Sequence, residues 1–77
     1  MSKRVLQMKP YQERIVNEYH ELKVKRDKLH AMIVKYEEGK LDFKPDCPIV
    51  LLQKQELVMN QYLTILEERA LIENITL

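Results

Sequence analysis

One stripe of side chains in the first third of the chain has the chemistry to hold a nucleotide. Tyr11, Arg14, Glu18 and Lys25 recur at steps of 3, 4 and 7 residues, so a helix would carry them along one face. Tyr11 would lie in the first turn, where free backbone N–H groups and the positive end of the helix dipole favour anions. An aromatic ring beside cationic side chains can stack a base and bind its phosphate. The same spacing is typical of a solvated helix face, so a plain packing role stays open.

Two arginines stand in rows that are otherwise apolar. Arg26 and Arg69 occupy positions filled elsewhere by Leu, Ile or Tyr, and Gln12 and Gln55 belong to the same rows. Polar residues at such positions can fix the register and the number of associating helices. The alternative is that the guanidinium groups bind an anionic ligand through paired hydrogen bonds in a pocket. Both interpretations remain open at the level of sequence.

Residues for catalysis or metal binding do not form a recognisable pattern. His20 and His30 lie ten positions apart and would face different sides of a helix. Cys47 is the only cysteine, without a neighbouring base to activate it. The chain lacks a Ser-His-Asp arrangement, a glycine-rich phosphate loop and metal-ligand spacing. We therefore expect a protein that is not an enzyme and that uses no cofactor and no metal.

Prolines and the single glycine divide the chain. Pro10 and Pro48 suit the first position of a helix, and Asp46 or Cys47 could cap the second start, with Asp46 the better side chain. Gly39 suits the end of the first helix, because glycine adopts the left-handed conformation without a steric cost.

These signals predict an all-α fold, an antiparallel helical hairpin. We expect an N-terminal arm over 1–9 and a hairpin domain over 10–77, with helices over about 10–37 and about 48–75 and a connection over 38–47. Leu41 and Phe43 in the connection are expected to close over the end of the hairpin.

The apolar residues of both predicted helices repeat at alternating steps of four and three, the spacing of helices that wrap around each other. The first row is Ile15, Tyr19, Leu22, Arg26, Leu29, Ile33 and Tyr36. The matching row of the second helix is Leu51, Gln55, Val58, Tyr62, Ile65, Arg69 and Ile72. The second helix also carries a further apolar row: Leu52, Met59, Leu63, Leu66 and Ala70.

The two rows of the second helix together exceed what one partner helix can bury. We therefore expect an oligomer, a four-helix dimer or a larger ring of helical bundles, in which Leu52, Met59, Leu63 and Leu66 meet a second hairpin. Small size favours the same conclusion, since 77 residues without a disulfide build only a marginal core.

Charge and hydropathy exclude several classes of protein. Lysine and arginine number 13 and aspartate and glutamate 12, with a net +4 over residues 1–44 and −3 over 45–77. This balance lacks the dense basic stripe of a general DNA binder, so no DNA partner is expected. No apolar run approaches the length of a membrane span and no signal peptide is evident, so we expect no membrane partner and a cytoplasmic protein.

The chain resembles a family of small phage-encoded helical-hairpin proteins. The resemblance covers about residues 9–73. The residues that carry it in the first helix are Lys9-Pro10-Tyr11-Gln12-Glu13-Arg14-Ile15-Val16, Glu21-Leu22-Lys23 and Lys28-Leu29. Those in the second helix are Leu51-Leu52-Gln53 and then Met59, Tyr62, Leu66 and Arg69, in a Met-x-x-Tyr-x-x-x-Leu-x-x-Arg rhythm.

This wider group includes phage anti-CBASS proteins and a domain of a Thoeris antagonist. The resemblance implies an anti-defence sponge, a homo-oligomer and typically a hexamer, that sequesters cyclic di- or trinucleotide immune signals in the host cytoplasm without turnover. It further implies that Tyr11 contacts a base and that Arg26 or Lys25 contacts phosphate, with Arg69 as the candidate for a separate cyclic-trinucleotide pocket.

A second class of function stays open beside the sponge. The surplus Leu and Met face of the second helix is typical of surfaces that dock onto another protein. A phage adaptor or inhibitor that binds a host protein through this face is therefore the alternative.

Overall fold

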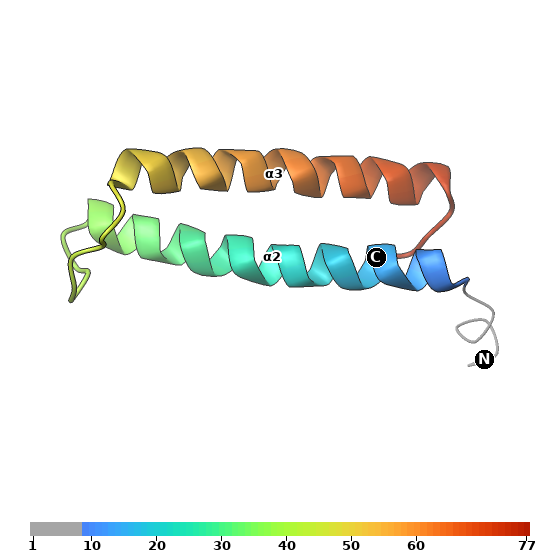
Figure 1. Ribbon diagram of the computed structural model, residues 1–77, viewed down its shortest axis with the longest axis horizontal. Coiled ribbons are helices and arrows are strands. Elements are labelled where there is room, and N and C mark those ends of the chain that lie inside the picture. Colours follow the sequence, from blue (N-terminus) through green and yellow to red (C-terminus); the bar gives the residue numbers. More distant parts are fainter. Residues whose placement is uncertain (1–8) are drawn as a thin grey trace.

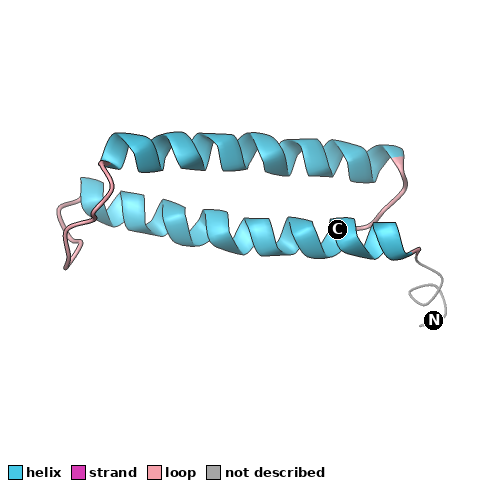
Figure 2. Cartoon of the chain, viewed as in Figure 1, coloured by secondary structure: helices cyan, strands magenta, loops and turns pink. Residues whose placement is uncertain are grey.

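Residues 9–77 of the computed structural model form two antiparallel helices (Figure 1), and the structure is described over this range. Helix α2 spans Pro10–Glu37 and helix α3 spans Ile49–Ile72. Over the described residues, the secondary structure consists of helices and loops (Figure 2). The predicted all-α class and the hairpin are confirmed, and both helices lie within three residues of the predicted bounds. The predicted arm over 1–9 lies outside the described residues, except for Lys9.

The two helix starts differ in their capping. Pro10 occupies the first position of α2 as predicted, and the Lys9 backbone N–H donates to Gln12 Oε1 at 3.0 Å, so a side chain returns to satisfy the cap residue. At α3, Pro48 stands one position earlier than predicted, at the N-cap itself. No side-chain hydrogen bond caps α3, so the prediction for Asp46 or Cys47 is wrong. The reason is that a proline at the N-cap leaves both residues outside the first turn.

Both helices end in the same kind of turn. Gly39 has a φ of 70° and Asn74 a φ of 57°, the left-handed conformation that closes a Schellman motif. After α2, the N–H of Lys40 donates to the Lys35 carbonyl at 2.8 Å. After α3, the N–H of Ile75 donates to the Ala70 carbonyl at 2.8 Å. The prediction for Gly39 is confirmed, whereas Asn74, whose short polar side chain tolerates this conformation, was not recognised from the sequence.

The turn at Asn74 sends the C-terminal residues back across the end of the hairpin where α2 begins and α3 ends. We call this the open end, and the end with the connection between the helices the closed end. Figure 1 shows the segment after α3 passing toward the beginning of α2. Ile75 and Leu77 pack there against the buried cluster formed by Ile15, Tyr19, Leu63 and Leu66. Three layers of chain therefore meet at this end, which explains why the core is concentrated there.

The core between the helices uses the second apolar row of α3 and leaves the first one exposed. The buried residues are Ile15, Tyr19, Ile33, Leu63, Leu66 and Ala70. The row expected to face α2 is instead exposed: Leu51, Val58, Tyr62, Ile65 and Ile72 each keep at least 39% of their surface. The assignment of the two rows of α3 was therefore wrong, although the prediction of surplus apolar surface is confirmed.

The four residues that were expected to contact a second hairpin are therefore placed differently from the prediction. Leu63 and Leu66 are buried inside the hairpin, and Leu52 and Met59 are half-buried at its edge. The physical reason is the polar content of each row. The buried row presents Leu63, Leu66 and Ala70 to the core, and its polar position, Glu56, is half-buried and paired with His30. Burying the other row would instead enclose Gln55 and Arg69 at a desolvation cost.

Leu66 tests this placement, because its side chain is fully buried. We expect Leu66→Ala to lower the free energy of unfolding by about 3 kcal/mol through lost burial and a residual cavity. Leu71→Ala on the same helix is the matched control, since Leu71 is 80% exposed and should change stability by less than about 0.5 kcal/mol. Urea unfolding at one fixed protein concentration measures both. Equal losses in the two variants would contradict the placement of the core row.

Candidate functional site

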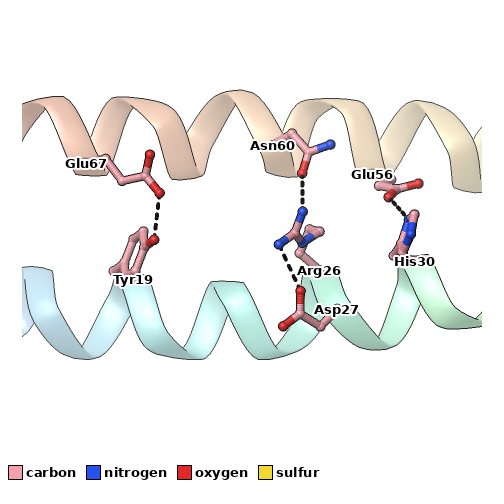
Figure 3. A network of polar contacts seen from close by, with 7 residues as sticks. All are labelled: Tyr19, Arg26, Asp27, His30, Glu56, Asn60 and Glu67. Atoms are coloured by element: carbon pink, nitrogen blue, oxygen red, sulfur yellow. Dashed lines mark hydrogen bonds and ion pairs between the residues drawn. The ribbon is translucent and has the colours of Figure 1, made fainter. Parts of the chain in front are cut away.

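One side of the hairpin carries polar contacts that join the helices. Figure 3 shows these contacts in sequence along α2 and α3. They are the Tyr19 hydroxyl donating to Glu67 Oε2 at 2.6 Å, Arg26 Nη1 donating to Asn60 Oδ1 at 3.1 Å, and His30 Nδ1 with Glu56 Oε2 at 2.5 Å. From Tyr19 to His30 the residue numbers rise along α2, while those of the partners fall along α3 from Glu67 to Glu56. The contacts therefore fix the antiparallel register. We call this the polar side.

Arg26 is held by protein groups on the polar side. Its Nη1 donates to Asn60, and its Nη2 lies 2.9 Å from Asp27 Oδ1. The Nε atom is buried without a hydrogen-bond partner. Since the guanidinium already spans the two helices, its geometry favours the register role over the ligand role that the sequence left open.

Tyr19 is the most buried of the side chains that make these contacts. Its ring belongs to the buried cluster, and Lys23 Nζ lies 5.9 Å from the ring centroid. The hydrogen bond to the Glu67 carboxylate, together with burial, raises the pKa of Tyr19 above its ordinary value. The phenol therefore stays protonated and keeps donating to Glu67 across the neutral range.

Lys25 and the exposed apolar row lie on the opposite side. Successive helical residues are rotated by about 100°, so Lys25 and Asp27 flank Arg26 on opposite sides of α2. Asp27 contacts Arg26 on the polar side, which places Lys25 on the other. The same argument on α3 separates Glu67, on the polar side, from Ile65, because Leu66 between them points into the core.

Three of the predicted ligand residues share the open end of this second side. Tyr11 and Arg14 lie in the first turns of α2 and Arg69 in the last turn of α3, and Figure 1 shows these two helix ends next to each other. Tyr11 is 41% exposed and Arg14 is exposed. Arg69 is half-exposed, with its Nε 3.8 Å from Glu73 Oε2. We call Tyr11, Arg14 and Arg69 the open-end cluster.

Lys25 is separate from the open-end cluster within one hairpin. It lies on the same side but about 16 Å farther along α2 than Arg14, at 1.5 Å per residue. A single small ligand at the open end therefore reaches Tyr11, Arg14 and Arg69 more readily than Lys25. Arg26, on the polar side, is not brought together with them.

The apolar part of the same side forms a shallow groove along α3, with a volume of about 490 Å³. Its lining residues are Leu51, Lys54, Gln55, Val58, Met59 and Tyr62. Sequence reasoning assigned this row to the core and so missed it as a surface. Its polar members, Gln55 and Arg69, were the signal that could have identified it.

The structure also bears on metal binding and on membrane spanning. Within residues 9–77, no group of three His, Cys, Asp or Glu side chains is arranged to hold a metal ion. Neither α2 nor α3 is long and apolar enough to cross a membrane.

The raised pKa of Tyr19 gives the polar side a measurable pH dependence. Its stabilising hydrogen bond is fully present below the unfolded-state pKa of about 10 and is lost as the pH rises through the higher folded-state pKa. Tyr19→Phe should therefore be less stable than the wild type by about 1 kcal/mol near pH 8, and this difference should shrink above pH ~10. Urea unfolding at stepwise higher pH measures the difference, with Tyr11→Phe as control. A difference that stays constant up to strongly alkaline pH would contradict the assignment.

Comparison with known proteins identifies a family for this chain. No curated protein and no solved structure matches the chain. The model of the family described as Sequestin matches residues 9–72, a range that includes both helices and the open-end cluster. The name of that family indicates a sequestering role, which is binding rather than catalysis. Because the match covers most of the chain, the protein belongs to the Sequestin family.

Proposed function

We propose that the protein is a phage anti-defence sponge that sequesters cyclic di- or trinucleotide immune signals in the host cytoplasm. It binds the signal stoichiometrically and releases it unchanged, so that host effectors do not receive it. Membership of the Sequestin family supports the sequestering role. The observation that carries the choice of ligand is the open-end cluster, where an exposed tyrosine and two arginines share one end and one side of the hairpin.

The chemistry of the cluster suits this class of ligand. A cyclic oligonucleotide presents flat bases and at least two phosphates on a compact ring. Arg14 and Arg69 can each bind a phosphate through two parallel hydrogen bonds. Tyr11 supplies an aromatic face for a base, and the N-terminal end of α2 adds a favourable field for the negative charge.

A single hairpin leaves such a ligand largely open to water, so the proposal includes self-association. The residues proposed to meet a second copy are the exposed ones on α3: Leu51, Val58, Tyr62 and Ile65. This face adjoins the open-end cluster and Lys25 on the same side of the molecule. A second copy on this face would enclose the ligand and could supply a cation such as its own Lys25. A closed ring, for example a hexamer, would repeat the arrangement.

The alternative proposal is a phage adaptor or inhibitor that docks onto a host protein. The groove of about 490 Å³ along α3 favours it, because an apolar groove on a helix accepts a partner helix. The two proposals use the same face and differ in what covers it.

The mass of the protein in solution separates these proposals. We expect light scattering to give a multiple of the 9.3 kDa chain mass. Val58→Glu should reduce that mass toward a single chain, because a charge in a desolvated interface is costly. Leu71→Glu is the matched control, since Leu71 is exposed outside the proposed face. A wild-type chain that remains a folded monomer at high concentration would contradict the oligomeric sponge and favour the adaptor.

Binding is tested with purified protein and a panel of cyclic di- and trinucleotides. At about 100 times the dissociation constant, a bound ligand should add roughly 2.7 kcal/mol of stability, seen as a higher melting temperature. Arg14→Gln should weaken binding about tenfold or more through the lost charge-assisted hydrogen bonds. Lys25→Gln should also weaken it, whereas Lys23→Gln, two residues away on the polar side, should not.

Two results would count against the nucleotide proposal. One is a panel in which no compound shifts the melting temperature. The other is equal weakening by Lys25→Gln and Lys23→Gln, which would indicate a general effect of charge rather than contact with the ligand.

A further inference from the structure

The closed end of the hairpin holds a basic groove that the proposed function does not use. Its volume is about 420 Å³. It lies between the outer face of α2 and the connection that follows it, which Figures 1 and 2 show turning back past the end of α2. Its lining residues are Lys28, Ala31, Met32, Lys35, Lys40, Leu41, Asp42 and Phe43.

The helical wall of the groove combines two ammonium groups with an apolar floor. Lys28, Met32 and Lys35 are spaced by four and three residues, so they share one face of α2. Met32 is half-buried between the exposed lysines. The two lysines are about 10 Å apart along the helix axis at 1.5 Å per residue, a span that their long side chains can close around a ligand.

The opposite wall is set by the Schellman turn at Gly39. The bond from the Lys40 N–H to the Lys35 carbonyl reverses the chain and brings Lys40 and Phe43 to the groove. The prediction that Phe43 closes over the end of the hairpin is wrong, because its side chain is 56% exposed. Its ring borders this groove instead of entering the core.

The charge in the groove is positive, with two of its three lysines outside any ion pair of the described residues. Three lysines line it against one acidic residue, Asp42. Among the ion pairs of the described residues, Lys40 reaches Glu38 only at 4.0 Å, and Lys28 and Lys35 take part in none. Lys28 and Lys35, held near each other in this way, favour an anionic ligand.

We propose that this groove is a second ligand site that binds a mononucleotide bearing a di- or triphosphate. Phe43 and Met32 contact the base, and Lys28, Lys35 and Lys40 bind the phosphates. An exposed aromatic side chain beside cations is the arrangement that base stacking with phosphate binding requires. The volume falls within the range of about 300–1,000 Å³ typical of small-molecule sites.

This second site is independent of the open-end cluster. The two lie at opposite ends of a hairpin 49 Å long, and they share no residue. Failure at one end therefore says nothing about the other.

The composition of the chain supplies two specific reporters. Phe43 is the only phenylalanine and Gly39 the only glycine, so their nuclear magnetic resonance signals are unambiguous. Titration of the full chain with ADP should give a saturable ring-current shift of the Phe43 ring protons and a shift of the Gly39 amide. Inorganic pyrophosphate should displace ADP without the ring-current shift, and adenosine should bind far more weakly than ADP.

Variants distinguish binding in the groove from general attraction. Lys35→Gln should weaken ADP binding about tenfold through loss of a phosphate contact, and Phe43→Leu should weaken ADP binding but not pyrophosphate binding. Lys23→Gln, on the polar side and outside both proposed sites, is the matched control and should leave the ADP affinity unchanged.

Three results would overturn the proposal. The first is the absence of a saturable Phe43 shift up to millimolar ADP. The second is an unchanged affinity in Lys35→Gln. The third is a stronger response to a hexaglutamate peptide or to anionic lipid vesicles than to ADP, which would assign the groove to an acidic peptide or to a membrane surface.

Discussion

The rotation of α3 about its own axis decides nearly every other property of this hairpin. Burial of Leu63 and Leu66 against Ile15 and Tyr19 sets that rotation. Once this row points inward, Glu67 and Asn60 must lie to one side and the exposed apolar row to the other. The hydrophobic core is small, yet its placement gives this pair of helices two chemically different sides, the polar side and the side with the exposed apolar row.

The polar and apolar sides serve different purposes in the molecule. The contacts of Tyr19, Arg26 and His30 with α3 are satisfied within a single chain and hold the register of the helices. The other side leaves apolar surface and a tyrosine exposed, and its Arg69 is paired only with Glu73 on the same helix, at 3.8 Å. In the sponge that we propose, this second side faces the ligand and the neighbouring copies.

Arg26 and Arg69 show why equivalent positions in a repeat can differ in role. Both occupy the same kind of position in a row of apolar residues. Arg26 reaches Asn60 and Asp27 and becomes part of the framework. Arg69 lies on the exposed row near the open end, where its nearest carboxylate is Glu73 at 3.8 Å. The distinction depends on the facing helix and cannot be obtained from spacing alone.

Local signals in the sequence determined the helix bounds, the turn at Gly39 and the hairpin, because proline, glycine and heptad spacing act over a few residues. They also gave the stripe of Tyr11, Arg14 and Lys25. Only the tertiary structure decided which row of α3 is buried, since both rows satisfy the same period and the choice depends on the desolvation of Gln55 and Arg69. It likewise decided that Phe43 remains outside the core, because the path of a connection follows from the packing of the helices that it joins.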